Sequence, residues 1–122
     1  MRLSRQTVGR LGERLAERHL IDQGARLLER NYRKDFGEID LLVEDQGELV
    51  AVEVKTRDVE DFVRPEEVVR WSQLRRIVQA MTAYALDNDL LDRGWRIDVV
   101  LIVIERDGSV QRFEHLRSVY PG

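Results

Sequence analysis

The chain has 122 residues, of which 43% are hydrophobic and 35% charged, and its net charge is −3, a composition typical of one globular domain over residues 1–122. No apolar run reaches the ~20 residues that a membrane-spanning helix needs, and the polar N-terminus does not resemble a signal peptide. The absence of cysteine excludes disulfides, thiol nucleophiles and cysteine zinc sites, so a cytoplasmic protein without a membrane partner is expected.

The first predicted element is a helix from about Thr7 to Asp22, with Gly24 as its stop signal. Arginines and glutamates, among them Glu13, occupy its polar side. A short strand is expected to follow over residues 25–32. The apolar residues that recur near the helical period are Val8, Leu11, Leu15 and Leu20.

Two strand-like runs, residues 37–43 and 49–55, flank a turn at Gln46-Gly47 and predict a β-hairpin. Residues whose numbers sum to 93 then face each other across the hairpin. One face is expected to be wholly apolar, because side chains alternate between faces along a strand. Its predicted pairs are Leu41 with Val52, Val43 with Val50, and Ile39 with Val54.

The other face of the hairpin is expected to pair Asp40 with Glu53 and Glu38 with Lys55. Directly opposed side chains lie roughly 4.5–5.5 Å apart, and like charges in such pairs are destabilising. Asp40 and Glu53 therefore need a proton or a cation between them, and a divalent metal ion would serve. Glu38 could hold Lys55 in place or neutralise it.

Lysine usage adds to this expectation. Only Lys34 and Lys55 interrupt a chain whose other 18 basic residues are arginines. A compact ammonium group kept beside two carboxylates suggests a chemical need for it. The simpler interpretation of the same residues is a polar outer face with an incidental salt bridge.

The segment from Asp58 to Arg64 is acidic and has no clear period, so it is a candidate mobile loop. A long amphipathic helix is expected to begin at Pro65, where Glu66 and Glu67 suit the positive helix start, and to end near Leu86.

Residues 97–104 are almost continuously apolar, which predicts a central strand covered on both faces. Asp107-Gly108 predicts a turn into a last strand over residues 109–116. A structural ion pair between Asp98 and Arg96 is expected within the buried strand. The two histidines, His19 and His115, have no ligand-like spacing and are interpreted as isolated and non-catalytic.

The predicted order is α-β-β-β-α-β-β, and two helices on opposite faces of a mixed sheet would give a three-layer α/β domain. Leu42 and Ala51 share a face with Asp40 and Glu53, so we expect the carboxylates at the edge of a covered surface. A low dielectric there strengthens both their repulsion and their affinity for a cation.

Basic residues cluster in two places. Arg33 and Lys34 precede the hairpin, and Arg75 and Arg76 lie in the second predicted helix. Arg57 lies one alternating step beyond Lys55. Each could contact nucleic-acid phosphates, and each cluster could equally be solvated arginines on a surface rich in this residue.

An acidic residue on one strand followed by Glu-x-Lys on the next resembles the PD-(D/E)xK nuclease superfamily, whose fold is restriction-endonuclease-like. More closely, the chain resembles the small bacterial YraN-like proteins, often described as candidate endonucleases related to Holliday junction resolvases. The stretches that carry this resemblance are Gly12-Glu13 and residues 30–33, 37–42, 52–57 and 96–100.

The resemblance implies that Asp40 and Glu53 bind Mg²⁺ or Mn²⁺ and that Lys55 positions or activates the attacking water. Glu13 resembles an additional acidic residue that some members contribute to the metal site. The chain departs from the family in two places. Ile39 stands where the motif has proline, and Ser72 or Gln73 stands where a basic residue is typical, so Arg75 or Arg76 would have to contact phosphate instead.

The implied function is metal-dependent hydrolysis of phosphodiester bonds in DNA, with branched or recombination and repair intermediates as candidate substrates. The resemblance to resolvases, which cut two strands, also leads us to expect a symmetric homodimer. The alternative is a non-catalytic nucleic-acid-binding or scaffold protein that retains the nuclease fold.

Overall fold

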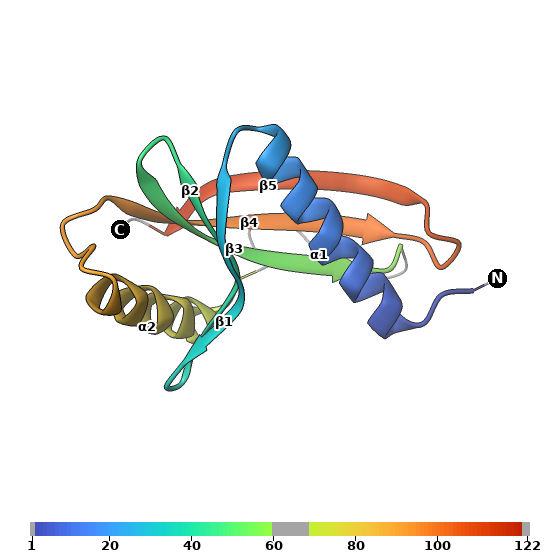
Figure 1. Cartoon of the computed structure of the whole chain (residues 1–122). Helices are drawn as coiled ribbons and strands as arrows, with labels where there is room; N and C mark the ends of the chain where they lie inside the picture. Colours follow the sequence, from blue (N-terminus) through green and yellow to red (C-terminus); the bar gives the residue numbers. More distant parts are fainter. Residues whose placement is uncertain (1, 60–68, 121–122) are drawn as a thin grey trace.

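The computed structural model describes residues 2–59 and 69–120, and its five strands form one sheet in the order β1-β2-β3-β4-β5. Only β3 and β4 run parallel, and α2 lies between them in the sequence, as a crossover connection requires (Figure 1). This is the layout expected from the sequence. The elements are α1 (Arg5–Asp22), β1 (Arg26–Lys34), β2 (Gly37–Asp45), β3 (Glu48–Arg57), α2 (Trp71–Asp87), β4 (Trp95–Ile104) and β5 (Val110–Tyr120).

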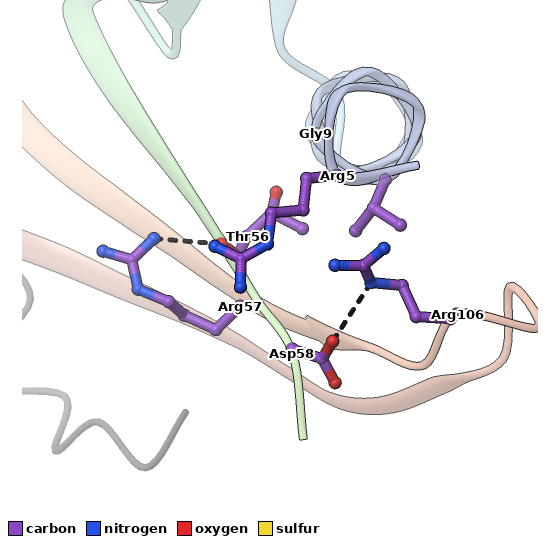
Figure 2. A pocket seen from close by; sticks show the side chains of 7 residues that line it. Arg5, Gly9, Thr56, Arg57, Asp58 and Arg106 are labelled. Atoms are coloured by element: carbon purple, nitrogen blue, oxygen red, sulfur yellow. Dashed lines mark hydrogen bonds and ion pairs between the residues drawn. The ribbon is translucent and has the colours of Figure 1, made fainter. Parts of the chain in front are cut away.

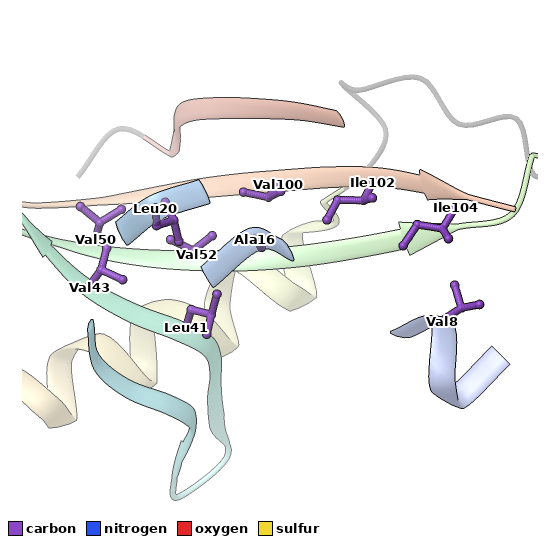
Figure 3. Packing of buried hydrophobic residues seen from close by; sticks show 10 residues of the cluster. All are labelled: Val8, Ala16, Leu20, Leu41, Val43, Val50, Val52, Val100, Ile102 and Ile104. Atoms are coloured by element: carbon purple, nitrogen blue, oxygen red, sulfur yellow. The ribbon is translucent and has the colours of Figure 1, made fainter. Parts of the chain in front are cut away.

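The two helices cover opposite faces of the sheet, which confirms the predicted three-layer α/β arrangement. Along β3, Val50 and Val52 contact the cluster under α1, whereas Leu49 and Ala51 contact the cluster under α2. Figure 3 shows Ala16 and Leu20 of α1 over the first of these clusters. The α2 residues buried in the second cluster are Leu74, Ile77, Ala80 and Met81.

The predicted hairpin is confirmed where β2 and β3 pair. Leu41 faces Val52 and Val43 faces Val50, in the expected register. Gln46 and Gly47 have φ values of +50° and +82°, which a tight two-residue hairpin turn requires at both central positions.

The expected pairing of Ile39 with Val54 is wrong, because the regular ladder between β2 and β3 begins only at Leu41. Ile39 is buried in the α2 cluster, on the face opposite to Leu41. On the neighbouring strand, Asn31 has a φ of +48° and lies between the residues that pair with Ile39 and Leu41. This left-handed residue interrupts the alternation of side chains, and β1 runs steeply across the direction of β4 and β5 (Figure 1).

Both helices are present, with one boundary corrected. The Ser4 side chain accepts a hydrogen bond from the Thr7 N–H and caps α1. The second helix begins at Trp71 and ends at Asp87, so the start expected at Pro65 is wrong: Val69 and Arg70 are not helical. Pro65 itself, Glu66, Glu67 and most of the acidic candidate loop lie outside the described residues.

The central strand β4 is buried along most of its length, as predicted. Beside it, β5 extends to Tyr120, beyond the expected end at residue 116. A register shift between Ile97 and Val99 and a φ of +54° at Ser118 accompany this extension. The edge strand β1 likewise reaches Lys34 and not residue 32.

Two glycines allow the helices to approach the hairpin closely. A Cβ atom at Gly12 of α1 would lie 2.1 Å from Thr56 Oγ1 of β3. A Cβ atom at Gly37 of β2 would lie 2.5 Å from the backbone nitrogen of Ala80 in α2. Residues 37–57, which carry the candidate carboxylates, are therefore held from both sides.

Replacing Gly12 by Ala is expected to destabilise the protein by ~1–3 kcal/mol, because the new methyl group overlaps the Thr56 hydroxyl. Urea unfolding measures the change. Gly9→Ala is the control, since nothing lies within 4 Å of a Cβ there, and it is expected to gain up to ~1 kcal/mol from helix propensity. Adding Thr56→Ala to Gly12→Ala is expected to restore part of the loss. Equal stabilities for Gly12→Ala and Gly9→Ala would contradict the close approach.

Candidate functional site

A cavity of about 120 Å³ lies between β2, β3 and the start of α2. The two strands contribute carboxylates, and α2 contributes polar side chains that close the opposite wall. We call it the carboxylate cavity, and its lining residues are Glu38, Asp40, Glu53, Gln73, Arg76 and Ile77.

Asp40 lies where β2 leaves the regular ladder. Its Oδ2 atom accepts a hydrogen bond of 2.8 Å from the Val54 N–H, so the side chain takes over a position that a strand carbonyl would otherwise fill. Burial raises the pKa of Asp40, against the opposing effects of the Val54 N–H and a hydrogen bond with Glu53. The contact with the Val54 N–H fixes the orientation of the carboxyl group.

Glu53 is only 16% exposed, and its Oε1 atom lies 3.3 Å from Lys55 Nζ, which is 11% exposed. Burial raises the pKa of Glu53 to about 7, and repulsion by Asp40 contributes to the rise while Lys55 opposes it. Glu53 therefore keeps its proton to a pH well above the usual range of a glutamate. A bound cation would relieve the same repulsion.

The expected pair of Glu38 and Lys55 is wrong, because β2 and β3 have diverged at this level. Glu38 instead accepts a hydrogen bond of 2.9 Å from Arg76 of α2 and one of 3.3 Å from Arg33 of β1. Lys55 instead forms an ion pair with Glu53, at 3.3 Å.

The Glu13 side chain of α1 interacts electrostatically with Asp40 and Glu38. Burial raises its pKa first, and repulsion by Asp40 and Glu38 raises it further. The described part of the chain nevertheless contains no group of three or more acidic or histidine side chains arranged to hold a metal ion. Glu13 is therefore coupled electrostatically to Asp40 and Glu38, but it does not complete such a group with them.

The basic residues predicted to contact nucleic acid do not all lie at the carboxylate cavity. Arg76 lines the carboxylate cavity and Arg33 donates to Glu38 of its lining, whereas Arg75 is exposed on α2 and does not line the cavity. Lys34 forms an ion pair of 3.0 Å with Asp87 at the far end of α2, outside the cavity. Arg57 bonds to the Thr56 carbonyl at 2.9 Å, at the end of β3.

The resemblance predicts a basic residue early in the second helix. The sequence alone did not decide whether Ser72 or Gln73 occupies that position. The structure places Gln73 in the carboxylate cavity and Ser72 on the exposed side of α2. The Gln73 side chain accepts a hydrogen bond of 3.2 Å from the Arg70 N–H, which also fixes the start of the helix. A neutral amide thus occupies the wall opposite the carboxylates.

Sequence reasoning missed a second polar network. Asp98 is fully buried and accepts from Arg96 at 3.0 Å, which confirms the expected ion pair. The histidines are not isolated: His115 Nε2 lies 2.8 Å from Asp98 Oδ2, and His115 Nδ1 lies 3.0 Å from His19 Nε2. Neither histidine lines the carboxylate cavity, and spacing alone could not reveal a contact between residues 96 positions apart.

The chain matches the model of one protein family, described as Uncharacterised protein family UPF0102, over residues 12–102. A UPF0102 protein of Nocardioides sp. is 41% identical over 94% of this chain and 92% of its own length. The UPF0102 protein of Beutenbergia cavernae is 40% identical over 95% of this chain and 98% of its own length. That of Moorella thermoacetica is 34% identical over 98% of this chain and 100% of its own length. In the described residues, no helix is both long and apolar enough to cross a membrane.

Replacing Glu53 by Gln is expected to change how stability depends on pH. The pKa of Glu53 is about 7 in the folded protein, against an ordinary value of 4.5 that applies when the chain is unfolded. As the pH rises between these values, the unfolded chain releases its proton first, so the wild type loses ~1–3 kcal/mol of stability. The Gln side chain does not ionise, so Glu53→Gln is expected to be spared this loss.

Urea unfolding without metal at about pH 5 and about pH 8 measures the difference. Glu29→Gln, at an exposed position of β1, is the control and is expected to follow the wild type. A Glu53→Gln variant that loses as much stability as the wild type over this range would show that the buried pair does not hold the proton.

Proposed function

The chain belongs to the UPF0102 family, and we propose that it is a metal-dependent endonuclease that hydrolyses phosphodiester bonds in DNA. One observation carries the proposal: Asp40 and Glu53, two half-buried carboxylates, share a polar cavity, and Lys55 stands 3.3 Å from one of them. A purely structural salt bridge would need one carboxylate for one lysine, and the second acid would only weaken the fold.

The residues present fit a divalent cation. Mg²⁺ prefers oxygen ligands, and commonly uses one or two carboxylates together with waters and a substrate phosphate. Asp40 and Glu53 would hold Mg²⁺ or Mn²⁺, and Glu13 would add negative charge from α1. When bound, such an ion supplies Lewis acidity at the phosphate and lowers the pKa of a coordinated water.

The roles of the protein's own groups follow from their contacts. The Val54 N–H fixes Asp40 in one orientation. Glu53 holds Lys55 by an ion pair. In this proposal the ammonium group would orient the attacking water and stabilise charge that develops on the phosphate. The low exposure of both side chains keeps bulk water from screening these interactions.

Basic residues around the carboxylate cavity support nucleic acid as the substrate. Arg33 and Arg76 both reach Glu38 at the cavity edge, and Arg75 lies exposed beside them. A phosphate that displaces Glu38 from the two guanidinium groups would gain bidentate partners. We include Arg57 and Lys34 as outlying contacts to the DNA backbone.

The alternative is a nucleic-acid-binding or scaffold protein that retains the nuclease fold without activity. Gln73 favours this alternative, because a neutral amide stands in the cavity where the resemblance predicts a basic residue. The net charge of −3 also favours weak rather than strong DNA binding. Cleavage of any DNA substrate that depends on Asp40 would exclude this alternative.

The finer parts of the proposal are a cytoplasmic location, a branched or repair-intermediate DNA substrate and a symmetric homodimer that cuts two strands. Sedimentation at high protein concentration tests the dimer: a second species of twice the mass is expected, and a monomer at all concentrations would contradict it.

Asp40→Asn is expected to remove Mg²⁺ and Mn²⁺ binding and any cleavage, while the protein stays folded and gains stability near pH 8 because the repulsion with Glu53 is gone. The amide oxygen can still accept the Val54 N–H. Calorimetric titration with each metal measures the binding, and two buffers of different ionisation enthalpy reveal the proton that Glu53 should release when metal binds.

Asp35→Asn is the matched control, since Asp35 is exposed in the turn between β1 and β2 and its φ of +55° suits asparagine. Metal binding like that of the wild type is expected. Metal affinity and DNA cleavage that survive unchanged in Asp40→Asn would overturn the assignment.

A further inference from the structure

A second, larger cavity of about 320 Å³ opens beside the end of β3 (Figure 2). Its walls come from the first turns of α1, the end of β3 and the turn between β4 and β5. It shares no lining residue with the carboxylate cavity. We call it the arginine cavity, and its polar and glycine lining residues are Arg5, Gly9, Thr56, Arg57, Asp58 and Arg106.

The arginine cavity concentrates positive charge in a protein of net charge −3. Three arginines line it against one aspartate. A recess with low-dielectric walls and one sign of charge focuses the electrostatic field and raises the local concentration of the opposite ion. The surplus of guanidinium groups therefore favours an anion.

Two of the three arginines are held in place by the fold. Arg106 donates to Asp58 Oδ2 at 3.1 Å through Nε and to the Leu3 carbonyl at 2.9 Å through Nη1. Arg57 donates to the Thr56 carbonyl at 2.9 Å. A guanidinium has five N–H donors, so each of these groups keeps further donors for a ligand. Preorganised arginines bind tetrahedral oxyanions with less loss of side-chain entropy than mobile ones.

The third arginine reaches in from α1. Figure 2 shows Arg5 extending from the helix over the end of β3, while Arg106 comes from the opposite side to meet Asp58. Gly9 leaves the helix wall open, because a Cβ atom there would meet nothing within 4 Å. The cavity of about 320 Å³ is roughly ten times the ~30 Å³ that one water occupies in the liquid, which is ample for a phosphate and its ester groups.

Strand β3 contributes residues to both cavities: Glu53 lines the carboxylate cavity beside α2, and Thr56 and Arg57 line the arginine cavity beside α1. Arg57 follows Lys55 by two residues, a separation of roughly 6.8 Å in an extended strand.

We propose that the arginine cavity binds a phosphate ester of the nucleic-acid strand, near the phosphate that the carboxylates would hydrolyse. The inference rests on the proposed function for its choice of ligand. The phosphate could be the terminal monoester of a strand end or an internal diester, and both present the same oxygens to the guanidinium groups.

The test uses the full chain without metal, so that no cleavage is involved. Amide NMR spectra are recorded while inorganic phosphate is added at constant ionic strength, with chloride as the reference anion. Phosphate, and not chloride, is expected to shift the amides of Gly9, Thr56 and Arg57. Phosphate that moves none of these amides would overturn the proposal.

Arg5→Gln is expected to weaken phosphate binding about fivefold or more, by removing one charged contact. Arg57→Gln is a second variant with the same expectation. Arg18→Gln removes the same charge from an exposed position of α1 outside the cavity, and its phosphate affinity is expected to match the wild type. Equal affinities of Arg5→Gln, Arg57→Gln and Arg18→Gln would overturn the proposal, because the binding would then be general attraction.

Short single-stranded oligonucleotides with a terminal phosphate or a terminal hydroxyl distinguish the two sources. A preference for the phosphorylated end that disappears in Arg5→Gln assigns the cavity to a strand end. Equal affinities that both fall in Arg5→Gln assign it to an internal diester. Oligonucleotide binding that Arg5→Gln does not weaken contradicts both assignments.

Asp40→Asn separates this proposal from the proposed function. The variant is expected to bind inorganic phosphate as the wild type does, because Asp40 does not line the arginine cavity. If the wild type binds phosphate but cleaves no DNA, the arginine cavity is supported and the proposed nuclease function is contradicted. If the wild type cleaves DNA but does not bind phosphate, the nuclease function is supported and the arginine cavity is contradicted.

Discussion

Asp40 and Glu53 lie together at a covered edge of the sheet, where water screens their charges poorly, and this closeness governs the rest of the site. Two adjacent, poorly solvated charges of one sign are unfavourable, and a proton or a cation relieves the repulsion. Lys55 lowers the repulsion but balances only one of the two acids. The fold thus tolerates a local electrostatic strain that metal binding would relieve.

The scaffold around the pair explains how such strain persists. Gly12 lets α1 approach β3, and Gly37 lets α2 approach β2, so both helices clamp the hairpin. Glu13 of α1 thus acts on Asp40 from one helix, and Gln73 of α2 lines the carboxylate cavity from the other. Hydrophobic clusters on both faces of the sheet supply the stability against which the carboxylate repulsion acts.

The sequence predicted those features that depend on local patterns. The turn at Gln46-Gly47 and the alternation of Leu41 and Val43 determined the hairpin register, and the apolar run of β4 indicated its burial. The pairings around Glu38 failed because the ladder between β2 and β3 begins only at Leu41, opposite the part of β1 where Asn31 is left-handed. The contact of His19 with His115 was beyond prediction because it needs the packing of α1 against β5.

The ionisation of Glu53 tests the account most directly, and it can be followed by NMR of the labelled side-chain carboxyl carbon during a pH titration. We expect a midpoint at a pH of about 7 in the metal-free protein. Saturating Mg²⁺ is expected to move the midpoint down, to or below the ordinary value of 4.5, because the ion replaces the proton. A midpoint already near 4.5 without metal, and unmoved by Mg²⁺, would contradict the claim that the pair is a cation site.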